Sequence, residues 1–160
     1  MALNPVTELE ALIDALDTDG VEYALCGGLA LGIHGHPRAT KDIDLLVIAT
    51  AVESALAAAR RAGFDVPARI MTFGLRTGRP RSVHRVSKLD PSSGDLLPLD
   101  LIVVNDDLAE VWTTRLTIDT GSRKLSVVSR SGLATMKKLA GRGQDLVDAA
   151  VLEGRTDDEE

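Results

Sequence analysis

The sequence predicts a single α+β domain in which a mixed central sheet is flanked by helices and the carboxyl-terminal region is helical. The chain has 160 residues, 44% of them hydrophobic, which suits one compact domain. Helical and strand-type hydrophobic spacings alternate along most of the chain, and from residue 131 onward only helical spacing remains. We expect the domain to span residues 1–153 and to be followed by a flexible acidic tail at 154–160.

Hydrophobic spacing, capping residues and breaks at glycine or proline assign the individual elements. Thr7 with Glu10 and Thr50 with Glu53 have the spacing of capping boxes, and Ser131 is placed as a third helix cap. The predicted elements are, in chain order, a helix at 7–18, a strand at 21–26, a short helix at 29–34, a strand at 42–48, a helix at 50–62, strands at 71–77 and 82–88 around a turn at 78–80, a strand at 97–104, a helical turn at 108–112, a hairpin of 116–118 with 125–128, and two helices near 131–139 and 146–152.

Charge is distributed unevenly along the chain. The formal net charge of -6 argues against a general nucleic-acid coat protein. Between Arg60 and Lys88, however, eight basic residues and one acidic residue occur. We call residues 60–88 the basic segment. It either contacts an RNA acceptor electrostatically, forms a solvated sheet face, or binds an acidic partner protein.

Two further features bear on the cellular location. The longest apolar run, residues 23–33, has 11 residues, whereas a membrane-spanning helix needs ~20, so we expect no membrane span. Cys26 is the only cysteine and cannot form an internal disulfide, which suits the reducing cytoplasm. Its position in a strand-like run predicts a buried packing residue.

Aspartates interrupt two of the apolar runs. In an extended strand, Asp42 and Asp44 face the same side while Ile43 enters the core. Asp100 lies in another buried run and completes a cluster if the two strands are neighbours. Three clustered carboxylates repel one another unless a cation lies among them, and Mg²⁺ prefers such oxygen ligands, with Mn²⁺ as the alternative. Taken alone, the Asp-x-Asp pair also fits a strand edge or a solvated loop, and Asp100 also fits a helix cap or an arginine partner.

Gly27 and Gly28 precede this cluster at a predicted turn between a strand and a helix. Glycine lets backbone N–H groups approach a phosphate closely, although a glycine pair by itself is usually only a turn. Together with a metal held by carboxylates, the turn predicts a site for a polyphosphate such as a nucleoside triphosphate.

These residues resemble the nucleotidyltransferase superfamily, which has the polymerase-β-like fold. Its pattern is Gly-Gly or Gly-Ser, about a dozen residues, Asp-hydrophobic-Asp, and a later strand acid. The stretch Gly27-Gly28-Leu-Ala-Leu-Gly-Ile-His-Gly-His-Pro-Arg38-Ala-Thr40-Lys-Asp42-Ile-Asp44 is similar to bacterial enzymes related to abortive-infection toxins of the AbiEii type, as is Met136-Lys137-Lys-Leu-Ala-Gly-Arg142. The matching motifs span residues 21–48, the strand around Asp100 and residues 131–152.

The resemblance implies the role of each site residue. Asp42 and Asp44 would bind divalent metals, and Asp100 would bind one of them while activating the acceptor hydroxyl. Gly27 and Gly28 would hold the triphosphate, and Lys137 with Arg38 or Arg142 would neutralise it. Apart from the resemblance, Arg38 and Thr40 lie just before the acidic strand and either orient the nucleotide or stabilise a loop. Gly28 departs from members with Gly-Ser, because it leaves only backbone donors at the turn. Asp145 and Asp148 are expected to pair with Lys138 or Arg142.

Three functions are compatible with this site. The first is a magnesium-dependent enzyme that adds nucleotides to an acceptor, tRNA for a toxin, which would have a cognate antitoxin protein as partner. The second is a small antibiotic nucleotidyltransferase of the lincosamide or aminoglycoside type. The third is a catalytically degenerate module that binds a nucleotide or a partner.

Overall fold

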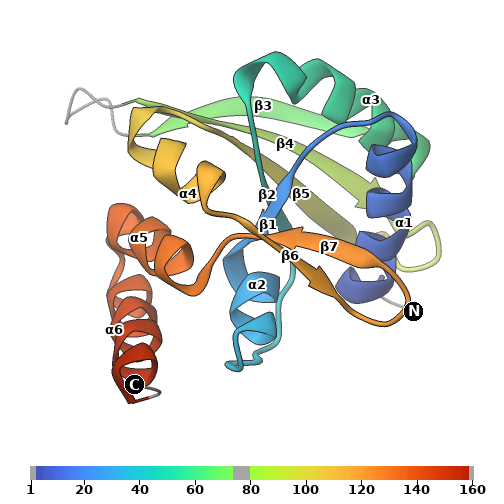
Figure 1. The fold of residues 1–160 in the computed structure, drawn as a ribbon. Helices are drawn as coiled ribbons and strands as arrows, with labels where there is room; N and C mark the ends of the chain where they lie inside the picture. Colours follow the sequence, from blue (N-terminus) through green and yellow to red (C-terminus); the bar gives the residue numbers. More distant parts are fainter. Residues whose placement is uncertain (1–2, 74–79, 159–160) are drawn as a thin grey trace.

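The computed structural model describes residues 3–73 and 80–158, which form a seven-stranded mixed sheet with helices on both sides. The helices are α1 (Pro5–Thr18), α2 (Gly27–Ile33), α3 (Val52–Arg61), α4 (Ala109–Thr113), α5 (Arg130–Ala140) and α6 (Gly143–Asp158). The strands are β1 (Ala24–Cys26), β2 (Ile43–Val47), β3 (Val66–Phe73), β4 (Arg81–Leu89), β5 (Leu96–Val103), β6 (Leu116–Asp119) and β7 (Lys124–Val127). Figure 1 shows α1 and α3 at one side of the sheet, and α2, α5 and α6 at the other.

The strand order places the two aspartate-bearing strands next to each other. The order is β3-β4-β5-β2-β1-β7-β6. Strand β2 is parallel to β5 and β1 is parallel to β7, whereas the other pairs are antiparallel. The mixed α+β architecture predicted from the sequence is therefore confirmed, and β2 and β5 lie side by side within the sheet.

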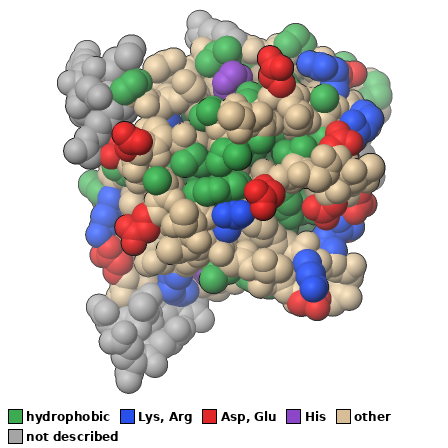
Figure 2. Space-filling view, turned by 45° about the horizontal axis from the view of Figure 1, so that its top comes forward, with side chains coloured by type: hydrophobic (Ala, Val, Ile, Leu, Met, Phe, Trp, Pro, Cys, Tyr) green, Lys and Arg blue, Asp and Glu red, His purple; other side chains and the backbone are tan. Residues whose placement is uncertain are grey.

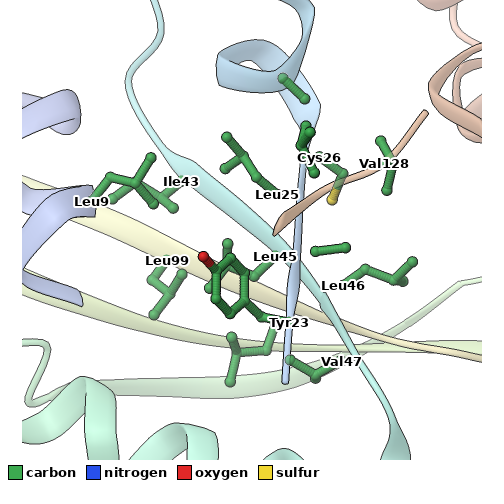
Figure 3. Close-up of a cluster of buried hydrophobic side chains, with 14 of the residues drawn as sticks. Leu9, Tyr23, Leu25, Cys26, Ile43, Leu45, Leu46, Val47, Leu99 and Val128 are labelled. Carbon is green, nitrogen blue, oxygen red and sulfur yellow. The ribbon is translucent and has the colours of Figure 1, made fainter. Parts of the chain in front are cut away.

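The core lies on both faces of β2. Ile43 and Leu45 on one face and Leu46 on the other are fully buried. Figure 3 shows Leu9 of α1 toward Ile43, and Cys26 toward Val128 on the opposite side of β2. Cys26 is 0% exposed, which confirms that it is a packing residue. A charged side chain on β2 must therefore be placed where this apolar covering ends.

The helices begin at other caps than the spacing predicted. Asn4, not Thr7, caps α1, because its side chain accepts a hydrogen bond from the N–H of Val6 at 2.9 Å and Pro5 suits the first helical turn. Helix α3 follows a 3₁₀ turn at Ala49–Ala51 and has no side-chain cap. Ser129, not Ser131, caps α5 through a 3.0 Å bond from the N–H of Gly132.

The hairpins and the last helix agree with the sequence in part. The pair β6 and β7 confirms the predicted hairpin. Strands β3 and β4 also pair as predicted, but β3 begins at Val66, earlier than expected. Residues 74–77 of the predicted strand and 78–79 of the predicted turn lie outside the described residues. Helix α6 continues to Asp158, past the expected end of the domain at residue 153, and the flexible tail stays a prediction. Among the described helices, none is long and apolar enough to cross a membrane.

Gly27 connects the fold to the aspartates. Its φ of +68° is in the left-handed region that favours glycine. A β-carbon at this position would lie 2.8 Å from Cγ of Asp44 and would overlap its carboxylate oxygen. Any larger residue therefore strains the backbone and displaces Asp44 as well.

We expect Gly27→Ala to lower the free energy of unfolding by more than its matched control, Gly20→Ala. Gly20 has a similar φ of +66° but has no atom within 4 Å of an added β-carbon. The control should therefore lose only the backbone preference, about 1 to 2 kcal/mol, whereas Gly27→Ala should lose roughly 1 to 3 kcal/mol more through the clash. Urea denaturation measures both losses, and equal losses would contradict a contact between Gly27 and Asp44.

Candidate functional site

Three aspartates converge on one face of the sheet. Asp42 immediately precedes β2, Asp44 lies within it, and Asp44 is the register partner of Asp100 on β5. One carboxylate oxygen from each of the three lies within 4.8 Å of the other two. Among the described residues, this is the only group of three or more His, Cys, Asp or Glu residues with such spacing. The convergence predicted from the sequence is confirmed.

Burial and mutual repulsion disfavour full ionisation of this cluster. Burial, followed by the charges of Asp42 and Asp100, raises the pKa of Asp44 from 3.8 to about 7. Burial and the charge of Asp100 raise the pKa of Asp42 as well. A divalent cation among the three oxygens would relieve this repulsion, and an all-carboxylate donor set suits a hard cation. The residues therefore fit a divalent metal, which they could hold together.

Arg85 on β4 binds the third carboxylate from the other side. Its Nε donates to Oδ1 of Asp100 at 2.7 Å, and its Nη2 donates to Oδ2 at 2.9 Å. Arg85 and Asp100 are direct register partners in the antiparallel pair of β4 and β5. Sequence reasoning placed Arg85 only in the basic segment, because the register between β4 and β5 cannot be read from hydrophobic spacing.

The glycine turn lies against the same cluster. Gly27 contacts the side chain of Asp44, as described above. A β-carbon on Gly28 would overlap Cγ2 of Thr40, so Thr40 fills the space beside this glycine. The chain thus brings Gly27 to Asp44 and Thr40 to Gly28, and the methyl group of Thr40 occupies the space that a side chain at residue 28 would need.

A second charged cluster contains the predicted phosphate-binding cations. Lys137 Nζ lies 3.2 Å from Asp148 and 3.5 Å from Asp145. Arg38 donates two hydrogen bonds to Asp148, at 2.6 and 3.1 Å, and Arg142 donates to Asp145 at 2.6 Å. The expected pair of Asp145 with Arg142 is confirmed. Lys138 instead pairs with Glu153. Asp148 pairs with Lys137 and with Arg38, which is far from it in the sequence.

This second cluster, which we call the cation network, is ionised and borders the aspartates. Asp145 and Asp148 are 3% and 2% exposed. Burial acts to raise the pKa of each, but hydrogen bonds and charges from Arg142, Arg38 and Lys137 outweigh burial, so that both pKa values are lowered. Lys137 also acts on Asp44, and Arg142 on Asp42, through their charges. The two clusters therefore share one electrostatic environment.

Three cations of the basic segment that the structure describes lie in separate ion pairs. Arg61 pairs with Asp19, Lys88 with Glu8 and Arg85 with Asp100, each through a contact of 2.7 or 2.8 Å. Arg85 and Lys88 are three residues apart on β4 and so point to opposite faces of the sheet. In the coloured part of the face in Figure 2, Lys and Arg side chains stand beside Asp and Glu, and hydrophobic side chains occupy the middle. The charges of Arg61, Arg85 and Lys88 are thus balanced locally.

Solved structures share this fold at low sequence identity. A Thermotoga maritima protein provisionally described as a nucleotidyltransferase has a TM-score of 0.59 and 15% identity, with 97% of this chain and 93% of that chain covered. The lincosamide antibiotic adenylyltransferase LnuA, bound to lincomycin, has a TM-score of 0.56 and 17% identity over 92% and 95% of the two chains. The antibiotic-resistance factor ANT(2'')-Ia has a TM-score of 0.59 and 15% identity over 92% and 80%.

These similarities establish the polymerase-β-like nucleotidyltransferase fold.

A search of curated proteins gives no match. A sequence model of the family described as nucleotidyl transferase AbiEii toxin, type IV toxin–antitoxin system, matches residues 10–159, which include all three aspartates and the cation network. This chain therefore belongs to the AbiEii family of nucleotidyltransferases.

Proposed function

We propose that the protein transfers a nucleoside monophosphate from a nucleoside triphosphate to an acceptor hydroxyl and releases pyrophosphate. The observation that carries this proposal is the convergence of Asp42, Asp44 and Asp100 within 4.8 Å. We propose Mg²⁺ as the resident cation and Mn²⁺ as its substitute. When bound there, the cation would stabilise the charge on the attacking and leaving oxygens of an in-line displacement.

The three aspartates would have separate tasks. Asp42 and Asp44 would supply oxygens for the cation, and their geometry depends on β2 and on the space that Gly27 leaves. Asp100 would bind the cation as well, and would accept the proton of the acceptor hydroxyl as the hydroxyl oxygen attacks the α-phosphorus. The bond between the α-phosphorus and its bridging oxygen would break, and pyrophosphate would leave with that bonding pair.

The cation network would bind the triphosphate. Lys137, Arg38 and Arg142 carry fixed positive charge next to the aspartates, and Gly27, Gly28 and Thr40 lie at the turn on the same side. Asp145 and Asp148 would keep the three cations in place before substrate binds. Because the side chains of Arg38 and Arg142 are 40% and 81% exposed, their remaining N–H groups can donate to a phosphate while the bonds to Asp148 and Asp145 persist.

We further propose that the acceptor is tRNA, reached through the basic segment, and that a cognate antitoxin protein binds this toxin. Membership of a toxin–antitoxin family supports the antitoxin partner, and the eight basic residues of the basic segment support a polyanionic acceptor. The local pairing of Arg61, Arg85 and Lys88 weakens the case for a long RNA groove. The reducing environment that suits Cys26 supports a cytoplasmic site of action. A small antibiotic as acceptor, or the loss of catalysis, would be an outcome of the assay below.

We expect Asp44→Asn to reduce nucleotide transfer at least ~100-fold without unfolding the protein, because it removes a carboxylate that holds the cation. The assay combines radiolabelled nucleoside triphosphates, Mg²⁺ and either total tRNA, a lincosamide or an aminoglycoside. Glu53→Gln, an exposed substitution on α3, is the matched control and should retain full activity. Failure of the wild type to label any acceptor would favour a degenerate module, and labelling of a drug would overturn the tRNA proposal.

The stability of the metal-free protein should depend on pH because of Asp44. Its pKa of about 7 in the folded state lies above the value of 3.8, so the folded form retains a proton that the unfolded form releases between these values. Stability should therefore decrease as the pH rises through this window. In melting curves, the wild type should lose Tm relative to Asp44→Asn as the pH rises, and Mn²⁺ should restore the wild type alone. Parallel curves for the two proteins would contradict the repulsion.

We expect Lys137 to contribute both to nucleotide binding and to the stability of the fold. Lys137→Ala leaves Asp145 and Asp148 buried with fewer partners, so we expect a loss of about 1 to 3 kcal/mol in unfolding free energy and a KM for the nucleotide raised roughly 10-fold. Lys138→Ala is the control, because the Lys138 side chain is 54% exposed and contributes less than ~1 kcal/mol. Urea denaturation and initial rates measure the two effects, and an unchanged KM would remove Lys137 from the phosphate site.

A further inference from the structure

A cross-strand row connects Arg85 to the site. In adjacent strands, Cys26 of β1 pairs with Asp44 of β2, Asp44 pairs with Asp100 of β5, and Asp100 pairs with Arg85 of β4. All four side chains thus occupy one face at one level of the sheet. Arg85 is consequently placed by backbone register and does not depend on a mobile loop.

We propose that Arg85 is the positioning residue of Asp100: it fixes the plane of this carboxylate so that its remaining lone pairs face Asp42 and Asp44. The proposal rests on the function proposed above. Arg85 donates to both oxygens of Asp100, at 2.7 and 2.9 Å, in the two-point geometry that a planar guanidinium allows. A carboxylate has about four lone-pair sites, so two remain for a cation and for the acceptor proton.

The surroundings of Asp100 make this restraint necessary. Its side chain is 11% exposed, and the other two carboxylates of the cluster repel it. Without an opposing donor, rotation about its side-chain bonds would turn the carboxylate away from Asp42 and Asp44. Arg85 binds Asp100 from the neighbouring strand β4, and its own side chain is 37% exposed, so the pair lies at the margin of the site.

Two other roles for Arg85 give different expectations. If Arg85 only competes with the cation for Asp100, replacing Arg85 should increase the affinity for the metal. If Arg85 only joins β4 to β5, replacing it should lower the stability and leave the metal affinity unchanged. Arg85→Lys separates these roles, because lysine keeps the positive charge but cannot make the two-point contact.

The experiment measures Mn²⁺ affinity by electron paramagnetic resonance, Tm, and the kcat and KM of transfer for the wild type and Arg85→Lys. We expect Mn²⁺ to bind roughly 10-fold more weakly to the variant and kcat to fall by a similar factor, with KM for the nucleotide within about twofold. The control is Arg123→Lys, which alters an arginine–aspartate pair on α1 and the β6–β7 turn, outside the site. It should leave Mn²⁺ affinity and kcat unchanged.

The outcomes distinguish this inference from the proposed function. Unchanged or tighter Mn²⁺ binding by Arg85→Lys would overturn the positioning role and leave the proposed function intact. Weaker Mn²⁺ binding together with no transfer by the wild type would support the positioning role and overturn the proposed function. If the wild type binds no Mn²⁺, both fail.

Discussion

The structure depends on the placement of three mutually repelling carboxylates on one face of a sheet. Strand register sets Asp44 opposite Asp100, and alternation along β2 sets Asp42 on the same side. Repulsion and burial raise the pKa of Asp44 to about 7, so the folded chain keeps a site that is unfavourable unless positive charge is supplied. Burial of the apolar side chains on both faces of β2 favours folding, and this free energy outweighs the cost of bringing the aspartates together.

The residues around the three aspartates accommodate their charge and their close packing. Gly27 leaves room for the Asp44 side chain, and Arg85 binds Asp100 at both oxygens. On another side, the cation network keeps three cations near the aspartates and balances them with Asp145 and Asp148. Carboxylates that can bind a metal thus lie beside cations that can bind phosphate. This arrangement suits a nucleoside triphosphate with a bound metal ion, which presents both a cation and phosphate groups.

Much of this could be predicted from the sequence, because local chemistry determines it. The acid-bearing strands follow from spacing, whereas spacing left Lys138 and Arg142 open as partners of Asp145 and placed Gly27 and Gly28 before the helix that they begin. Contacts set by register or by long-range packing do not follow from spacing: Arg85 with Asp100, Arg38 with Asp148, and Lys88 with Glu8 join residues whose separation carries no periodic signal. The helix caps were misplaced by two or three residues at Asn4 and Ser129, since several polar residues compete near each helix start.

We propose that Asp42, Asp44 and Asp100 together hold a divalent cation. Anomalous diffraction from crystals soaked in Mn²⁺ would locate that ion. We expect an anomalous peak within coordination distance of an oxygen from each of the three side chains, with Arg85 still bound to Asp100. A peak elsewhere, or an undisturbed carboxylate cluster without a peak at saturating Mn²⁺, would contradict it.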